Sequence, residues 1–151
     1  MMSLRASLTD VGFKALNRFH RAVVHASRGR VGSSAFGMPI VELLTVGRRS
    51  GLIRSTMLTV PIVEGGRYVL VASKGGDDRD PDWYRNILTT ADVELLVAGE
   101  RRPMRARVAT QAETIALWPR VVSAYAPYDG YRRRARRDVP LVICEPRRTE
   151  A

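Results

Sequence analysis

A basic, glycine-flanked segment that could bind an anion is GRRSGLIR, residues 47–54, where Arg48, Arg49 and Arg54 surround Ser50. The flanking glycines allow positive φ and close approach of the backbone, and exposed N–H groups in such a turn can form an anion-binding concavity. Arginine forks match phosphate or carboxylate groups. The alternative is a hairpin turn that is basic only because the whole chain is basic.

A second glycine turn, ASKGG at residues 72–76, follows an expected buried strand. It contains Lys74, one of only two lysines in the chain, and the hydroxyl of Ser73. Gly75 and Gly76 let the backbone approach a ligand closely. This second turn favours the anion-binding interpretation of both turns.

Aromatic side chains come next in the chain. Trp83, Tyr84 and Asn86 lie at an expected helix start, and together with the two turns they suggest a flat ring held beside an anionic tail. The alternative for Trp83 is a place in the core. The sequence then brings Tyr125, Tyr128 and Tyr131 at every third position, roughly one helix face. These tyrosines either cover the core or line the mouth of a site for an aromatic substrate, with phenol groups for hydrogen bonds.

Composition limits the other function classes. The chain has 151 residues, enough for one domain, and a formal net charge of +10. Aromatic residues make up only 7% and do not alternate with basic ones, which argues against nucleic-acid binding. Cys144 is the single cysteine and the chain has two histidines, so no disulfide and no metal site are expected. With no long apolar run and no secretory signal, a cytoplasmic protein is expected.

Hydrophobic periodicity predicts the elements that position these residues. Helical segments are expected at 10–27, 80–90 and 111–125, with Asp80 as an N-cap and Pro119 as a kink or break. Strands are expected at 38–46, 54–64 with an interruption at Pro61, 68–73, 92–99, 102–110 and 138–146. Short turns join most strands, which predicts an α+β fold, mainly β, with an antiparallel sheet or barrel and helices outside it. Residues 1–35 are expected to form an amphipathic helix and a flexible linker, and residues 36–151 the barrel domain.

The ordered series of motifs over residues 36–146 resembles the deazaflavin (coenzyme F420)-dependent nitroreductase family of actinobacteria. The resemblance implies a split β-barrel, similar to FMN-binding and flavin-reductase-like folds, that binds F420 in a groove. It implies hydride transfer from reduced F420 to a hydrophobic or aromatic acceptor: a quinone, a nitroaromatic or another conjugated compound. The cofactor would carry the chemistry, and the protein would supply binding and orientation.

The resemblance also implies roles for individual residues. The phosphate and oligoglutamate tail of F420 would be held by Arg48, Arg49, Ser50 and Arg54. The phosphate region and the ring would meet Met57, Leu58, Ala72, Ser73, Lys74, Gly75, Gly76, Trp83, Tyr84 and Asn86. The acceptor pocket would be shaped by Tyr125, Tyr128 and Tyr131, and a pocket tyrosine, Ser73 or solvent would deliver a proton.

One stretch departs from the nitroreductase pattern. Where that pattern reads Asn-Pro-Leu-Tyr, this chain has residues 56–59, so Thr59 replaces an aromatic beside the reacting ring. The departure concerns the acceptor more than the cofactor. Three alternatives stay open: a non-catalytic F420 carrier, an FMN-dependent barrel reductase, and membrane contact through the basic N-terminal helix. The sequence does not fix the oligomeric state.

Overall fold

The computed structural model describes residues 34–147. The predicted helix at 10–27 and most of the linker lie outside the described residues. The strands are β1 (Ser34–Ala35), β2 (Met38–Val46), β3 (Ile53–Thr59), β4 (Ile62–Glu64), β5 (Arg67–Val71), β6 (Asp92–Val97), β7 (Glu100–Val108) and β8 (Leu141–Pro146). The helices are a short 3-10 turn, η1 (Lys74–Gly76), and α2 (Asp82–Thr89), α3 (Gln111–Ala124) and α4 (Pro127–Arg134).

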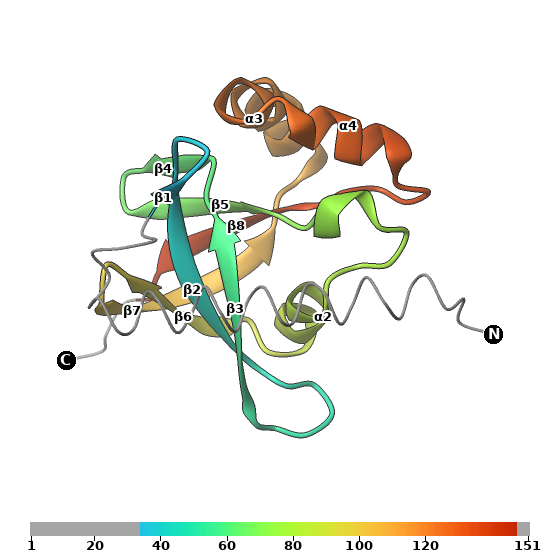
Figure 1. The fold of residues 1–151 in the computed structure, drawn as a ribbon. Helices are drawn as coiled ribbons and strands as arrows, with labels where there is room; N and C mark the ends of the chain where they lie inside the picture. The colour runs from blue at the N-terminus through green and yellow to red at the C-terminus, as the bar shows by residue number, and fades with distance from the viewer. Residues whose placement is uncertain (1–33, 148–151) are drawn as a thin grey trace.

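The strands form one curled sheet in the order β1-β2-β6-β7-β8-β5-β4, and β3 pairs with the other edge of β2 (Figure 1). Every pairing is antiparallel. The predicted antiparallel barrel with helices outside it is therefore confirmed. Tight turns make this path possible, because Gly65 and Gly66 adopt positive φ between β4 and β5, as Gly99 does between β6 and β7.

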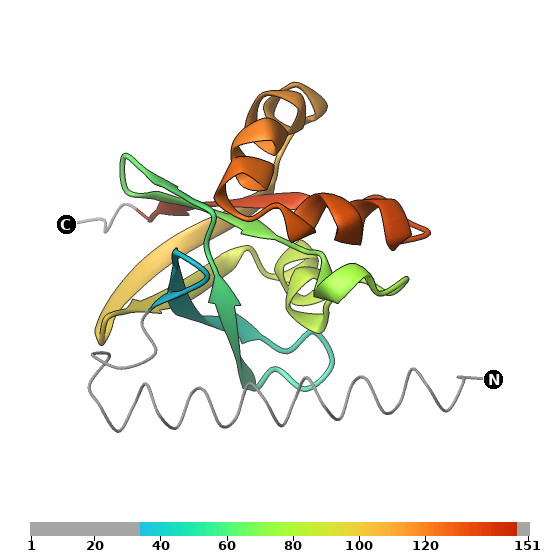
Figure 2. The ribbon, with the colours of Figure 1, turned by 45° about the horizontal axis from the view of Figure 1, so that its top comes forward.

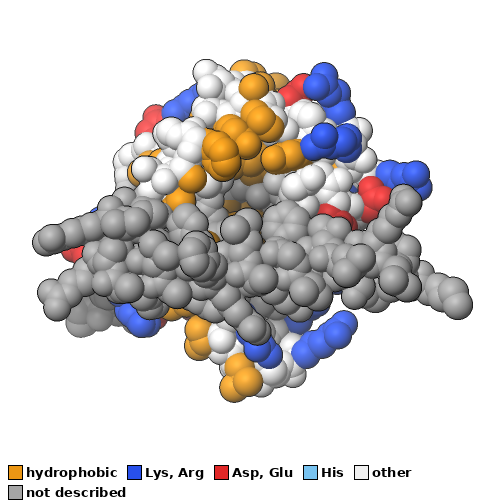
Figure 3. All heavy atoms as spheres, viewed as in Figure 1, with side chains coloured by type: hydrophobic (Ala, Val, Ile, Leu, Met, Phe, Trp, Pro, Cys, Tyr) orange, Lys and Arg blue, Asp and Glu red, His pale blue; other side chains and the backbone are white. Residues whose placement is uncertain are grey.

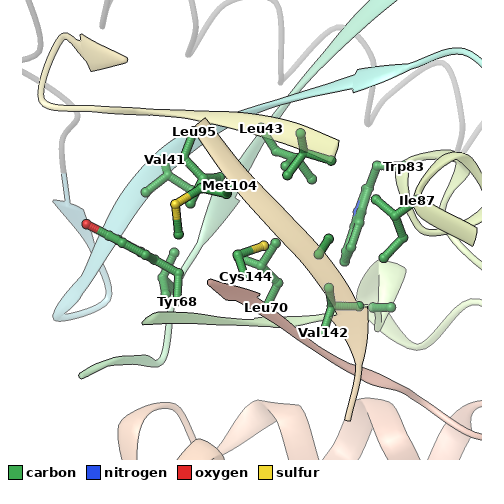
Figure 4. Packing of buried hydrophobic residues seen from close by; sticks show 14 residues of the cluster. Val41, Leu43, Tyr68, Leu70, Trp83, Ile87, Leu95, Met104, Val142 and Cys144 are labelled. Atoms are coloured by element: carbon green, nitrogen blue, oxygen red, sulfur yellow. The ribbon is translucent and has the colours of Figure 1, made fainter. Parts of the chain in front are cut away.

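Two apolar clusters lie on opposite faces of the sheet. The inner cluster fills the curl and includes Leu43, Leu70, Leu95 and Met104 (Figure 4). Cys144 belongs to it, and burial raises the pKa of its thiol to about 12, which keeps the thiol protonated and inert. The outer cluster lies against α3 and α4. Among the described residues, no helix is long and apolar enough to cross a membrane.

The helices occupy different sides of the sheet. In both ribbon views α2 lies between the loop that joins β2 to β3 and the η1 turn, while α4 runs above η1 (Figures 1 and 2). The residues of both sequence-predicted anion turns therefore flank one helix. This arrangement gives the candidate site its frame.

Several element boundaries differ from the sequence prediction. β3 ends at Thr59 and β4 begins at Ile62, so the break expected at Pro61 is confirmed. Of the kink or break expected at Pro119, the break is wrong, since α3 continues through this residue. Its ring is exposed there, so solvent can satisfy the carbonyl that lacks a partner N–H. The N-cap of α2 is Pro81 and not Asp80, because the Asp80 carboxylate pairs with Arg137 instead.

Residues 34–37 also differ from the flexible linker that the sequence predicts. Ser34 and Ala35 pair with Pro39 and Met38 at the start of β2. The reversal uses Phe36 and Gly37, both at positive φ. This small hairpin places the exposed ring of Phe36 against Tyr125, shortly before α4.

Candidate functional site

The first anion turn is held in shape by its own backbone and by Ser50. The N–H of Gly47 donates to Leu52 O at 2.7 Å, and the N–H of Gly51 donates to Gly47 O at 2.8 Å. The Ser50 hydroxyl accepts hydrogen bonds from the Leu52 N–H at 3.1 Å and from Arg54 at 3.4 Å. Ser50 therefore organises the turn and orients Arg54, and its oxygen is directed into the turn.

Arg48 is engaged by α2. Its N–H and Nη1 donate to Asn86 Oδ1 at 3.2 and 3.0 Å, and Nη2 lies 3.4 Å from the Asp82 carboxylate. Asn86, only 3% exposed, also donates to the Thr45 hydroxyl at 3.0 Å. Asn86 and Arg48 thus fasten the turn to α2 and β2. The two arginines left at the exposed rim are Arg49 and Arg54.

The second anion turn has an unusual backbone. Ser73 is in the right-handed helical region, and the next three residues all have positive φ: Lys74 at 45°, Gly75 at 64° and Gly76 at 84°. A right-handed residue followed by a left-handed one aligns successive N–H groups into a concavity suited to an anion. The Ser73 side chain is 6% exposed, and Ala72 is fully buried. Their side chains are therefore less accessible than the backbone of the turn.

Tyr128 faces the far end of β3. Its hydroxyl lies 2.9 Å from that of Thr59 and 3.9 Å from the sulfur of Met38, and its ring is 5% exposed. Burial raises the pKa of Tyr128 above its ordinary value, with the bond to Thr59 opposing the shift. The phenol therefore stays protonated at neutral pH and keeps a proton for donation.

The other two tyrosines surround Tyr128. The Tyr125 and Tyr131 rings pack edge-on against it, with centroids 5.3 and 6.1 Å away. Phe36 stacks on Tyr125 at 5.0 Å and is 71% exposed. Figure 3 shows hydrophobic side chains gathered near the junction of α3 and α4, with Lys and Arg side chains beside them. The tyrosine series therefore forms one aromatic cluster, as the sequence predicts, and Phe36 adds to it.

The residues that the resemblance places at the cofactor ring do not all lie on one face of the sheet. Met57 and Leu58 are neighbours on β3, so their side chains point to opposite faces, and Leu58 packs against the inner cluster. Trp83 is 5% exposed and belongs to that cluster, which is the alternative that its sequence left open. Tyr84 is only partly buried and packs edge-on against Trp83. Like Leu58, Tyr84 packs against the inner cluster, so of this group only Met57 is not part of that packing among the described residues.

β3 connects the two halves of the site. Arg54 lies at its cationic end and Thr59 at its tyrosine end, five residues apart, or about 17 Å at the usual rise of a strand. An open hollow of about 510 Å³ lies elsewhere, between β4 and α3, and its lining includes Ile62 and Pro119 but none of the predicted site residues. A ligand with an anionic end and a flat end would have to span about the length of β3 to meet both groups of residues.

Comparison with known proteins decides which ligand this is. The sequence profile of the F420H(2)-dependent quinone reductase family matches residues 16–146. The chain belongs to this family. It is therefore an F420-dependent oxidoreductase, and coenzyme F420 is its cofactor. The resemblance found in the sequence is confirmed. The matched family is named for the reduction of quinones and not of nitro compounds.

Individual relatives agree with the family assignment. An F420H(2)-dependent quinone reductase of Mycobacterium tuberculosis is 36% identical over 88% of this chain and 91% of its own length. A solved F420-H2 dependent reductase, FDR-A, is 36% identical and superposes with a TM-score of 0.64, covering 71% of this chain and 94% of that one. A solved structure described as a domain-swapped dimer is 32% identical, with a TM-score of 0.67 over 85% of this chain and 96% of that one. The two solved structures share the fold of this chain, the split barrel that the sequence predicts.

Sequence reasoning missed two residues of the site. Phe36 lies in a stretch without periodicity, and no sequence signal distinguishes it. Arg137 lies in the basic run at 132–137, where it looks like one of several exposed charges, yet its side chain is only 13% exposed. Its isolation from solvent comes from the loop at 72–80, which folds over it.

Proposed function

We propose that this chain transfers a hydride from reduced F420 to a quinone-like acceptor, with the cofactor lying along β3. The observation that carries the proposal is the division of the site into a cationic end at Arg49 and Arg54 and a tyrosine end at Tyr128. Reduced F420, when bound, supplies the hydride. The protein binds and orients the cofactor and the acceptor and supplies the proton.

At the cationic end, Arg49, Arg54 and Lys74 would neutralise the phosphate and the oligoglutamate tail, with backbone N–H groups of the η1 turn as further donors. The donor set fits such a polyanion because two arginines lie at the exposed rim of the first turn and the second turn has the backbone of an anion nest. Arg48, Ser50 and Asn86 would shape this end without contacting the ligand themselves, because their polar atoms already bond to one another or to the turn.

At the tyrosine end, Tyr125, Tyr128 and Tyr131 would receive the acceptor. Burial and the neighbouring Tyr125 raise the pKa of Tyr131, as burial does for Tyr128, so both phenols are hydrogen-bond donors at neutral pH. A quinone oxygen that gains negative charge during reduction is stabilised by such donors. We assign proton delivery to this pair in preference to Ser73, because both phenols lie in the aromatic cluster proposed to receive the acceptor, whereas Ser73 lies beside the turn proposed to receive the phosphate.

Binding tests the cofactor assignment. Equilibrium dialysis should give saturable binding of F420 and much weaker binding of FMN, since FMN lacks the glutamate tail. Replacing both Arg49 and Arg54 by alanine should weaken F420 binding about 30-fold or more, because two charge-assisted contacts are lost. Arg102→Gln is the matched control, since Arg102 is exposed on β7 and pairs only locally with Glu100. Preference for FMN, or equal loss in the control, would overturn the assignment.

The second candidate function is a non-catalytic F420 carrier, which the same cationic end would serve. Turnover separates the two: a carrier binds reduced F420 but does not oxidise it faster with quinones, nitroaromatics or other conjugated acceptors. The enclosed hydroxyl pair of Thr59 and Tyr128 favours the enzyme, because tail binding alone has no use for it.

We also propose that the protein contacts anionic membranes peripherally, where quinones dissolve. The amphipathic pattern at 10–27 supports this, as do Leu52 and Ile53, 61% and 64% exposed beside the rim arginines. The full chain should sediment with vesicles that contain an anionic phospholipid and not with neutral vesicles. Phe19→Glu should abolish that binding, and equal sedimentation of the variant would contradict membrane contact.

A further inference from the structure

The loop at 72–80 carries a conformational cost that the loop itself does not offset. It contains three successive residues with positive φ, and the first is Lys74, whose side chain makes this region unfavourable. Such backbones persist only where surrounding contacts determine them. Two of its own hydrogen bonds, Gly76 N–H to Ser73 O at 2.9 Å and Asp77 N–H to Lys74 O at 3.2 Å, close the turn but do not anchor it to the sheet.

Arg137 provides that anchor. Its Nη2 donates to the carbonyls of Ala72 at 2.9 Å and Ser73 at 3.1 Å, and its Nε donates to the carbonyl of Asp77 at 3.1 Å. These three acceptors lie on both sides of the η1 turn. A single guanidinium therefore holds both ends of the turn at once.

Two further contacts fix the guanidinium itself. Its Nη1 lies 3.0 Å from the carboxylate of Asp80 and donates to the carbonyl of Asp138 at 3.1 Å. The turn is also pressed against α4, where a Cβ on Gly76 would come within 3.2 Å of the Tyr131 Cα. Arg137 thus joins the turn to the segment that follows the tyrosine helix.

We propose that Arg137 is a positioning residue, which fixes the conformation of the η1 turn so that the N–H groups not used within the turn are directed toward the anionic part of the cofactor. The proposal rests on the proposed function, in which that turn receives the phosphate. Lysine cannot replace Arg137, because one ammonium group lacks the planar fork that reaches four carbonyls and a carboxylate together. Because Arg137 bonds to backbone oxygens, its replacement should change the geometry of the turn and not only the local charge.

The test compares two ligands: F420 and a deazaflavin that lacks the phosphate and the glutamates. Arg137→Lys keeps the charge, so it should leave charge attraction unchanged but weaken F420 binding about tenfold through the lost fork. Binding of the phosphate-free deazaflavin should change by less than about twofold. Arg136→Lys is the matched control, because Arg136 is an exposed neighbour whose side chain lies 3.9 Å from Asp78, and F420 binding should stay unchanged.

Asp80→Asn provides a second variant in case Arg137→Lys does not fold. Removing a negative charge near an anion site would by itself strengthen F420 binding, whereas loosening Arg137 should weaken it about twofold to threefold. Guanidinium at low concentration should partly restore F420 binding to a folded Arg137→Ala variant.

The outcomes separate this proposal from the proposed function. Loss of affinity for F420 but not for the phosphate-free deazaflavin supports the positioning role. Unchanged or stronger F420 binding in Arg137→Lys or Asp80→Asn overturns it while leaving the proposed function intact, as does equal weakening of both ligands. A wild-type chain that does not bind F420 overturns both.

Discussion

The hydroxyl of Thr59 at the end of β3 lies 2.9 Å from the hydroxyl of Tyr128 on α4. At this position the nitroreductase pattern has an aromatic side chain, which would fill the space that Thr59 leaves. Thr59 thus places a smaller side chain with a hydroxyl where we propose that the acceptor binds. We expect this pair to set acceptor preference, because it lies at the end opposite the rim arginines.

The first prediction concerns this pair. A double-mutant cycle with Thr59→Val and Tyr128→Phe should give a coupling of about 1 kcal/mol in the free energy of unfolding, the usual net value of one hydrogen bond. Each variant should lower the rate of quinone reduction more than the affinity for F420. Denaturant unfolding and steady-state kinetics measure the two effects. Additive unfolding energies would show that the hydroxyls do not interact.

The second prediction concerns Trp83. Because its ring belongs to the inner cluster, Trp83→Ala should reduce stability by about 3–5 kcal/mol. The milder Trp83→Phe should leave the dissociation constant for F420 within about twofold of the wild type. Thermal unfolding and dialysis measure these quantities. A large loss of F420 affinity with unchanged stability would place the ring in the cofactor site instead.

The third prediction concerns Asn86. Asn86→Ala leaves Arg48 and the buried Thr45 hydroxyl without this amide, so stability should fall by about 2 kcal/mol. The loop after β2 should then loosen and F420 should bind more weakly, although Asn86 itself carries no charge. Asn86→Asp keeps an acceptor for Arg48 and should retain more affinity. Equal F420 affinity in the wild type, Asn86→Ala and Asn86→Asp would show that the bonds of Asn86 to Arg48 and Thr45 do not shape the site.

The fourth prediction concerns pH. The hydrogen bond from Arg107 lowers the pKa of Glu113 from its ordinary 4.5 to about 2. Folding therefore favours the charged carboxylate, so its contribution to stability is present above pH 4.5 and is lost as the pH falls toward 2. The difference in melting temperature between wild type and Glu113→Gln should be constant above about pH 5 and shrink at lower pH. A difference that does not change with pH would refute this.

Much of the fold was predictable because hydrophobic alternation and turn chemistry are local signals. β2 matches its predicted bounds of 38–46, and Pro61 interrupts the next strand as expected, since proline cannot donate to the ladder. The failure at Pro119 has a physical cause as well. Its helix is held by a capping box between Thr110 and Glu113 and by the contacts of Trp118 and Val121, none of which needs the backbone N–H that proline lacks.

The sequence predicted which candidate residues lie close together better than it predicted their contacts. Spacing grouped Tyr125, Tyr128 and Tyr131 correctly, but helix periodicity accounts only for Tyr128 and Tyr131 on α4, since Tyr125 is the extended C-cap residue of α3. It could not show that Arg48 bonds to Asn86 while Arg49 stays at the rim, since this depends on a contact 38 residues away. The same holds for Arg137, because three of its carbonyl acceptors lie 60 or more positions earlier. Backbone acceptors leave no trace in side-chain identity.

The central claim is hydride transfer from reduced F420 to a quinone, and oxidation of reduced F420 tests it most directly. With a naphthoquinone, the wild type should restore the absorbance of oxidised F420 far faster than the uncatalysed reaction, with saturation in both substrates. The Arg49→Ala, Arg54→Ala double variant should raise KM for reduced F420 at least about tenfold while Arg102→Gln does not. No rate above the uncatalysed reaction with any quinone, in a wild-type chain that binds F420, would contradict the account.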